Sequence, residues 1–278
     1  MTSIAGKTIL ITGATDGLGK EVAKRALHAG AIVLIHGRNK PKGERVVTEL
    51  INETNKDTIQ YYNANLSSLQ EVKDLSQNIT SDHDKIDVLI NNAAIGGGPK
   101  GGAERDLSAD GFELRFAVNH LAHFLLTQNL LSILKRSAPS RIVHVSSIGQ
   151  MPIDFDDIMM GKKFDSYTAY CRSKLAQILY GFELAEKLEG TQVTVNSLHP
   201  ATLMDTNMVH EFFGKVNSTI NDGADVVDHV AFSPETEHIS GAYFNQKREA
   251  KANAQAYDKE ARNKLWQVSE KLVSPFFL

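Results

Sequence analysis

Two side chains on one predicted helix could together move a proton. Tyr170 and Lys174 are four residues apart in the segment Tyr-Cys-Arg-Ser-Lys, and this spacing places both on one helical face. A lysine ammonium close to a phenol favours the phenolate, so we expect the pKa of Tyr170 to fall from about 10 toward neutrality. A tyrosine with such a pKa can act as a general acid or base near physiological pH.

The same spacing occurs a second time, because Tyr243 is also followed by a lysine four residues later. Tyr243 has no serine-bearing strand end just upstream, whereas Tyr170 follows the apolar run 141–145, which ends at Ser146 and Ser147. Ligands of open parallel sheets bind outside the carboxyl ends of the strands, so the Ser147 hydroxyl could hydrogen-bond a substrate carbonyl. We therefore choose Tyr170 and interpret the match at Tyr243 as a coincidence.

A glycine-rich turn near the start of the chain predicts phosphate binding. It lies between the apolar run 8–11 and a helical pattern that begins at Gly17 and ends at Gly30. Glycines there allow the backbone to approach a pyrophosphate, and the helix N-terminus supplies N–H groups and a partial positive charge. The alternative is a turn without a ligand, but its place between a strand and a helix favours a dinucleotide. The predicted contacts are Gly13, Thr15, Asp16, Gly17, Leu18 and Gly19.

The end of the second predicted strand indicates which dinucleotide binds. A carboxylate there would hydrogen-bond the ribose 2′-hydroxyl of NAD, but the sequence is His36-Gly37-Arg38-Asn39. Arg38 could instead pair with a 2′-phosphate through charge-assisted hydrogen bonds. The alternative is that Arg38 is only a solvated surface charge. The sequence predicts NADP(H) rather than NAD(H).

Apolar strands alternate with amphipathic helices along the chain. This order predicts a single doubly wound Rossmann-type α/β domain over residues 1–278, with a parallel sheet and helices on both faces. Residues 202–240 are the least regular region and are the predicted substrate lid. The predicted strands are 8–11, 31–35, 85–90, 141–145 and 193–198, and the predicted helices include 42–53, 68–79, 111–134 and 166–188.

Composition excludes several classes of protein. The 278 residues are 42% hydrophobic and 23% charged, which is typical of a globular protein. The formal net charge of −3 disfavours a nucleic-acid partner. With one cysteine, Cys171, neither an internal disulfide framework nor a cysteine-rich zinc site can form, and we predict no metal. No apolar run approaches the roughly 20 residues of a membrane span, so we expect a cytoplasmic protein without a membrane partner.

Together these motifs resemble the short-chain dehydrogenase/reductase superfamily. The residues that carry the resemblance are the pattern 12–19, the run Asn-Asn-Ala-Ala at 91–94, Asn119, Ser147, Tyr170 and Lys174. Segments 111–127, 241–244 and 265–270 look more specifically like the retinol-dehydrogenase-like branch. That likeness implies a lipophilic carbonyl or alcohol substrate.

The resemblance implies a role for each site residue. Tyr170 would exchange the substrate proton, and Ser147 would hold the carbonyl oxygen. Lys174 would contact the nicotinamide ribose, and Asn119 would help to hold a water that links Lys174 to solvent. Further cofactor contacts would come from Tyr170, Lys174, Asn65, Leu66, Asn92, Ala93, Ala94, Pro200 and Thr206.

The sequence departs from the family pattern at three places in the cofactor site. Asn65 stands where an aspartate is usual near the adenine, and an amide can still make one hydrogen bond, so we expect adenine binding to survive. Ala201 replaces the usual glycine after Pro200, and the loop to Thr206 is one residue longer. Thr206 is the expected ligand of the cofactor carboxamide.

These features predict an NADP(H)-dependent oxidoreductase that transfers a hydride between the nicotinamide and a small-molecule carbonyl or alcohol. One alternative is an NAD-linked alcohol dehydrogenase at the same site. Another is a catalytically silent NADP-binding regulatory protein, although the intact set of Ser147, Tyr170 and Lys174 argues against it. The resemblance also allows a homo-oligomer, because relatives often form dimers or tetramers.

Overall fold

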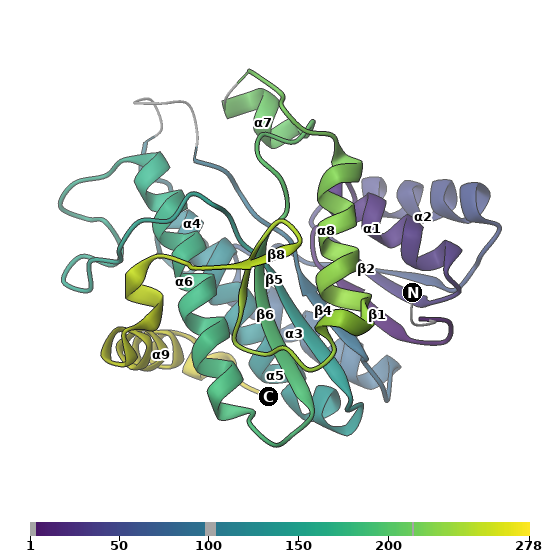
Figure 1. Ribbon diagram of the computed structural model, residues 1–278. Helices are drawn as coiled ribbons and strands as arrows, with labels where there is room; N and C mark the ends of the chain where they lie inside the picture. Colours follow the sequence, from purple (N-terminus) through teal and green to yellow (C-terminus); the bar gives the residue numbers. More distant parts are fainter. Residues whose placement is uncertain (1–3, 98–103, 213) are drawn as a thin grey trace.

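A twisted eight-stranded sheet forms the centre of the molecule (Figure 1). The computed structural model describes residues 4–97, 104–212 and 214–278. The strand order is β3-β2-β1-β4-β5-β6-β7-β8, and all neighbours are parallel except β7 and β8. The strands are β1 (Thr8–Ile11), β2 (Ile32–Gly37), β3 (Ile59–Asn63), β4 (Val88–Asn91), β5 (Ser140–Val145), β6 (Val193–His199), β7 (Tyr243–Asn245) and β8 (Arg248–Ala250).

The helices cover both faces of the sheet. On one face α1, α2 and α8 pack against residues such as Ile11 and Val143, and on the other α3, α5 and α6 pack against residues such as Leu10 and Ile142. The helix α9 lies outside α6. The helices are α1 (Gly17–His28), α2 (Lys40–Thr54), α3 (Leu69–Asp82), α4 (Leu114–Phe116), α5 (Ala122–Arg136), α6 (Ser166–Lys187), α7 (Asn207–Phe212), α8 (Ile220–Phe232) and α9 (Lys259–Val273), with short helical turns at Ala117–Leu121, Pro234–Thr236, Ala254–Tyr257 and Ser274–Phe276.

The order of the strands creates a crevice at one end of the sheet. The chain crosses from the edge strand β3 back to β4, which lies on the other side of β1. At such a reversal the connections after the two central strands diverge, and a ligand can lie between them. The loops after β1, β4, β5 and β6 all meet at this end.

The predicted fold class is confirmed, and three short strands were missed. The edge strand β3 reads Ile-Gln-Tyr-Tyr-Asn, which lacks the continuous apolar run of a strand buried on both faces. β7 and β8 have three residues each, too few for a periodic pattern, and β8 is antiparallel. The pattern 111–134 predicted one helix, but a π-helical turn at Ala117–Leu121 separates α4 from α5.

The predicted lid region, 202–240, contains two different kinds of structure. The helix α8 packs on α1 and contributes Val227 and Val230 to the core, so it belongs to the layer that covers the sheet. The shorter α7 lies beyond the carboxyl ends of the strands (Figure 1). The function of this region as a lid stays a prediction, and it concerns α7 and its flanking turns.

Five histidines are buried in the described part of the chain and remain neutral there: His36, His120, His123, His144 and His199. Burial lowers the pKa of His36 and His199 to about 4, and that of His120 and His144 to about 3. His120 still has a polar partner, because its Nε2 lies 2.7 Å from the Ser269 hydroxyl. The fold therefore holds these rings in the uncharged form at neutral pH.

We predict that acid destabilises the protein through these rings. Their pKa values in the folded chain lie below the unfolded value of about 6.5, so the unfolded chain binds more protons between about pH 4 and about pH 6.5. The free energy of unfolding should fall as the pH falls through that window, by up to about 1.4 kcal/mol per pH unit for each histidine. Urea denaturation at about pH 7 and about pH 5 measures this slope.

His120→Gln should make the slope shallower, because glutamine can keep the hydrogen bond to Ser269 but cannot titrate. His28→Gln is the matched control, since His28 is exposed on α1, and it should leave the slope unchanged. Equal slopes in the wild type and in His120→Gln would contradict the prediction.

Candidate active site

The glycine-rich turn is packed tightly against the loop that follows β4. A Cβ atom on Gly13, whose φ is 65°, would lie 2.8 Å from Cα of Ala93. One on Gly19 would lie 2.6 Å from Nδ2 of Asn92, which donates a hydrogen bond to the Thr12 carbonyl at 2.8 Å. Only glycine fits at these two positions, and Asn92 fixes the shape of the turn at the N-terminus of α1.

A buried threonine and histidine complete this connection. The Thr12 hydroxyl accepts hydrogen bonds from the backbone N–H groups of Asn92 and Ala93, at 2.9 and 3.0 Å. His123 places Nε2 3.1 Å from that hydroxyl and Nδ1 3.1 Å from the Asn119 carbonyl. Because a carbonyl only accepts, we assign the ring hydrogen to Nδ1, and Nε2 accepts from Thr12. Burial keeps the pKa of His123 well below its usual 6.5, so the ring stays neutral.

Asp16 joins the turn to two other helices. Its carboxylate accepts from the Gly17 N–H at 2.8 Å, which caps α1, from Lys42 Nζ of α2 at 2.5 Å, and from Asn207 Nδ2 of α7 at 2.8 Å. Burial alone would raise the pKa of Asp16, but the hydrogen bonds from Lys42 and Gly17 hold it below 3.8. Asp16 was predicted at the cofactor, but no sequence motif marked Lys42, which lies four residues after Arg38 at the start of α2.

The predicted cation for a 2′-phosphate is free at the end of β2. Arg38 is exposed and makes no hydrogen bond or ion pair with any residue that the structure describes. The neighbouring Gly37 has no room for a side chain, because a Cβ there would lie 2.5 Å from Cγ2 of Thr15. Thr15 thus connects the phosphate turn with the strand end that carries Arg38.

Ser147 and Tyr170 meet beyond the carboxyl end of β5. The Ser147 hydroxyl accepts from the Gly149 N–H at 3.0 Å. Tyr170 is in the second turn of α6, which begins where Asp165 caps the helix by accepting from the Thr168 N–H. Burial raises the pKa of Tyr170 to about 12, and a hydrogen bond with Ser147 opposes that rise.

Lys174 is anchored under the site. Its Nζ donates to the Val145 carbonyl at 2.9 Å and to Oε1 of Gln177 at 3.0 Å, and it lies 5.9 Å from the centre of the Tyr170 ring. Burial lowers the pKa of Lys174 to about 7. The expectation that Lys174 brings the pKa of Tyr170 down to neutrality is wrong for the chain alone. Desolvation of the phenol outweighs a cation at this distance that is itself easily discharged.

Asn119 lies in the π-helical turn Ala117–Leu121, a type of helical irregularity that often occurs at functional sites. Its Nδ2 donates to the Ile95 carbonyl at 3.1 Å and to the Ser173 hydroxyl at 2.9 Å, and its Oδ1 accepts from the Ile95 N–H at 2.9 Å. The side-chain amide therefore connects the loop after β4 with α6. The role of Asn119 in holding a water stays a prediction.

The predicted adenine contacts follow β3. The Oδ1 atom of Asn65 accepts from the Ser67 N–H at 3.1 Å, and its backbone N–H donates to Glu71 at 2.7 Å. Leu66 is buried in the core beside α3. The Asn65 side chain thus closes a local turn that leads into α3, and its amide nitrogen stays available for a hydrogen bond.

The segment after β6 crosses over the phosphate turn. Pro200 is buried directly after the last residue of β6. Thr206 lies 3.4 Å, through Cγ2, from the position that a Cβ on Gly17 would take. The predicted ligands Thr206 and Gly17 are thus neighbours, and Ala94 follows Ala93 at the exit of β4.

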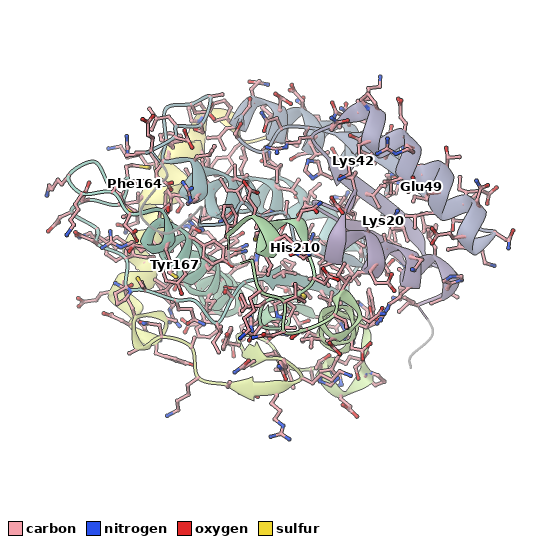
Figure 2. All side chains as sticks on the ribbon, turned by 90° about the horizontal axis from the view of Figure 1, so that it is seen from above. Lys20, Lys42, Glu49, Phe164, Tyr167 and His210 are labelled. Atoms are coloured by element: carbon pink, nitrogen blue, oxygen red, sulfur yellow. The ribbon has the colours of Figure 1, made fainter. Side chains whose placement is uncertain are left out.

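Apolar side chains gather between α7 and the start of α6. A side chain on Gly96 would collide with the ring of Phe212 and with Met208, both on α7. Tyr167 packs against Gly97 on the facing side. Figure 2 shows α7, marked by His210, between Tyr167 on one side and Lys42 on the other. Tyr167 connects this wall to the loop after β5, because its hydroxyl and the Ser147 hydroxyl both lie near Gly149.

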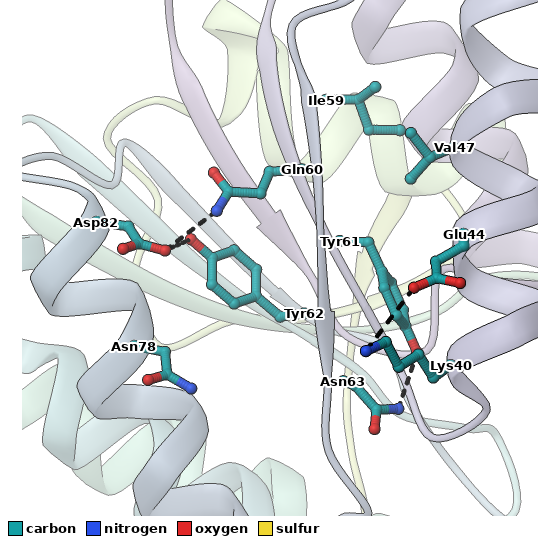
Figure 3. A pocket seen from close by; sticks show the side chains of 10 residues that line it. All are labelled: Lys40, Glu44, Val47, Ile59, Gln60, Tyr61, Tyr62, Asn63, Asn78 and Asp82. Carbon is teal, nitrogen blue, oxygen red and sulfur yellow. Dashed lines mark hydrogen bonds and ion pairs between the residues drawn. The ribbon is translucent and has the colours of Figure 1, made fainter.

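A hollow of about 810 Å³ lies elsewhere, along the edge strand β3 between α2 and α3 (Figure 3). Tyr61 and Tyr62 form part of its wall, and the Tyr61 hydroxyl donates to the Gly37 carbonyl at 2.8 Å. It contains none of the predicted site residues. We therefore locate the candidate site from the converging side chains and not from this hollow.

Neither a metal-binding cluster nor a membrane-spanning helix occurs in the part of the chain that the structure describes. Within residues 4–97, 104–212 and 214–278, no three His, Cys, Asp or Glu side chains are grouped closely enough to hold a metal ion. In the same ranges no helix has both the length and the apolar character needed to cross a bilayer.

The chain is similar in sequence to known proteins. The family model described as short chain dehydrogenase matches residues 7–217. Retinol dehydrogenase 13 of Mus musculus is 36% identical over 288 residues, which cover 98% of this chain and 85% of the relative. Retinol dehydrogenase 14 of Homo sapiens is 39% identical over 296 residues, with 96% and 86% covered.

Solved structures agree with these relatives. An uncharacterized protein from Mycobacterium Paratuberculosis has a TM-score of 0.81 and 27% identity, and the match covers 98% of this chain and 95% of that one. A 3-ketoacyl-(acyl-carrier-protein) reductase from Brucella melitensis, complexed with NADH, has a TM-score of 0.70 and 26% identity, with 87% and 97% covered. Fold, motifs and relatives agree: the chain belongs to the short-chain dehydrogenase/reductase family of oxidoreductases and is retinol-dehydrogenase-like.

Proposed function

We propose that this protein is an NADP(H)-dependent reductase of lipophilic aldehydes or ketones. The observation that carries the proposal is the meeting of Ser147 and Tyr170 at the carboxyl end of β5, directly above the anchored Lys174. The phosphate turn, whose glycines leave no room for side chains, lies at the same end of the sheet. This is the arrangement that hydride transfer to a carbonyl requires, with the reacting groups and the dinucleotide turn facing one crevice.

The site holds the proton that reduction of a carbonyl needs. With a pKa raised by burial to about 12, Tyr170 keeps its proton at neutral pH and can give it to a carbonyl oxygen. Ser147 can hydrogen-bond the same oxygen, and Lys174 can hold a ribose through its ammonium. When bound, the nicotinamide supplies the hydride that the carbonyl carbon accepts. One hydride at carbon and one proton at oxygen convert the carbonyl into an alcohol.

The cations at the end of β2 support NADP(H). Arg38 is exposed, and no described residue pairs with it. Lys42 lies close by at the phosphate turn, paired with Asp16. Because a guanidinium can bind phosphate through two parallel hydrogen bonds, Arg38 would increase the affinity for a cofactor that carries the extra 2′-phosphate. A family member complexed with NADH keeps the NAD-linked alternative open as an outcome of the test.

The apolar wall supports a lipophilic substrate. Met208 and Phe212 of α7 contact Gly96, and Tyr167 of α6 contacts Gly97 and lies near Gly149, close to the Ser147 hydroxyl. The names of the two curated relatives, retinol dehydrogenases, point to substrates of the same apolar character. A cytoplasmic location and a homo-oligomer stay predictions from the sequence.

Tyr170→Phe tests the reaction itself. The variant should lose at least about 100-fold in kcat for carbonyl reduction, because it removes the proton donor and leaves the fold intact. NADPH consumption with a panel of aldehydes and ketones measures activity, and NADPH fluorescence measures binding, which should persist. Wild-type protein that binds NADPH but reduces no carbonyl would favour the silent regulatory alternative.

Arg38→Asp tests the cofactor choice. Loss of a charge-assisted hydrogen bond to phosphate, of about 1.5–3 kcal/mol, should raise the Kd of NADPH about 10- to 100-fold and leave that of NADH nearly unchanged. Arg45→Asp is the matched control, since Arg45 is exposed further along α2. Equal weakening of both cofactors by Arg38→Asp, or tighter NADH binding by the wild type, would contradict the assignment.

Phe212→Ala tests the substrate class. Loss of the ring should raise KM for a long-chain aldehyde about tenfold and hardly affect a two-carbon aldehyde, because burying a phenyl group contributes about 1.5–3 kcal/mol. Phe277→Ala, near the C-terminus, should change neither KM value. If Phe212→Ala affects both aldehydes equally, α7 does not select for length.

A further inference from the structure

The carbonyl of Ser147 is held from two sides. It accepts the Tyr243 hydroxyl at 3.0 Å and Nε2 of Gln150 at 2.9 Å. Tyr243 is only 3% exposed and lies on β7, where it pairs with Ser197 of β6. The tyrosine that sequence analysis set aside as a coincidence therefore lies at the catalytic loop, 96 residues away from Ser147 in the sequence.

The segment after β8 fixes the same loop from the outside. The Asn253 N–H donates to Oε1 of Gln150 at 2.7 Å, which orients the amide that reaches Ser147. Gln255 binds both backbone groups of Ile153, accepting from its N–H at 2.7 Å and donating to its carbonyl at 3.0 Å. The loop from Ser147 to Ile153 is thus bound along its length by residues from the C-terminal part of the chain.

These contacts fix the backbone from which the Ser147 hydroxyl projects. A peptide carbonyl with two donors cannot move or rotate without breaking both hydrogen bonds, so the Ser147 backbone is held in place beside Tyr170. Burial raises the pKa of Tyr243 to about 12, so its hydroxyl keeps the proton that it donates. Tyr243, Gln150 and Asn253 can therefore act on the reaction without touching the substrate.

We propose that Tyr243 is a positioning residue for catalysis, which, with Gln150, holds the Ser147 peptide so that the serine hydroxyl faces Tyr170. The inference rests on the proposed function and adds a part of the chain beyond residue 217, where the match to the family model ends. In this proposal, β7, β8 and the residues that follow β8 hold the loop from Ser147 to Ile153 in its shape.

Tyr243→Phe removes one hydroxyl and keeps the buried ring. We expect kcat for carbonyl reduction to fall about tenfold, as if the hydrogen bond from Ser147 to the substrate oxygen were lost. KM and the affinity for NADPH should be nearly unchanged. Tyr180→Phe is the matched control, because Tyr180 is also 3% exposed and its hydroxyl accepts from Gln128. That variant should keep kcat within about twofold.

The double variant with Ser147→Ala shows whether Tyr243 acts through Ser147. If it does, adding Tyr243→Phe to Ser147→Ala should cause no further loss of kcat, since the hydroxyl to be positioned is already absent. A full additional tenfold loss in that background would overturn the proposal. So would an unchanged kcat for Tyr243→Phe in an otherwise active enzyme.

Hydrogen–deuterium exchange tests the inference independently of activity. In Tyr243→Phe, the peptide that contains residues 146–150 should exchange several-fold faster, while in Tyr180→Phe it should exchange as in the wild type. Unchanged exchange in Tyr243→Phe would overturn the positioning role even if the enzyme reduced no carbonyl. Faster exchange with an inactive wild type would instead uphold the positioning role and reject only the proposed function.

Discussion

A reciprocal pair of hydrogen bonds between β5 and α6 is the constraint on which the candidate site depends. The Lys174 ammonium donates a hydrogen bond to the Val145 carbonyl, and the Ser146 hydroxyl donates one to the Lys174 carbonyl at 2.7 Å. A buried ammonium without acceptors would cost several kcal/mol, so the helix can settle only where the strand end offers its carbonyl. Ser147 is the next residue along the strand end, and Tyr170 is one helical turn before Lys174. Once β5 and α6 are joined in this way, the hydroxyls of Ser147 and Tyr170 lie next to each other.

The sequence contained enough information for the sheet, the phosphate turn and this central set, because each depends on local patterns. Apolar runs, glycines and a four-residue spacing can be recognised within a few residues. Tyr243 could not be found in this way, since its role depends on a contact across 96 residues. The pKa of Tyr170 was predicted in the wrong direction because a helical wheel gives proximity to Lys174 but not the burial of the phenol. The π-helical turn at Ala117–Leu121 could not be predicted either, because the spacing of apolar residues in this segment is that of an ordinary α-helix.

The phosphate turn and the catalytic helix are parts of one buried polar network. On α6, Gln177 accepts from Lys174, and the neighbouring Ser173 accepts from the Asn119 side chain. The Asn119 carbonyl accepts from Nδ1 of His123, whose Nε2 accepts from Thr12 beneath the glycine turn. Every member is neutral except Lys174, and burial already reduces its tendency to hold a charge. A network with one charge and many hydrogen bonds tolerates little displacement, because each lost bond leaves a buried polar atom without a partner. The network therefore fixes the distance between the glycine-rich turn and the catalytic candidates on α6.

The charge pattern at the end of β2 depends on Asp16. A carboxylate at a helix N-terminus is stabilising, but it also repels a phosphate that approaches the same turn. Here Lys42 pairs with Asp16 at 2.5 Å and cancels most of that repulsion, while Asn207 takes up a further lone pair. Among the described residues Arg38 has no acidic partner, so its charge is available to a phosphate. Without Lys42 the charge of Asp16 would be uncompensated, and the proposed preference for a 2′-phosphate would weaken even though no contact to that phosphate had been removed.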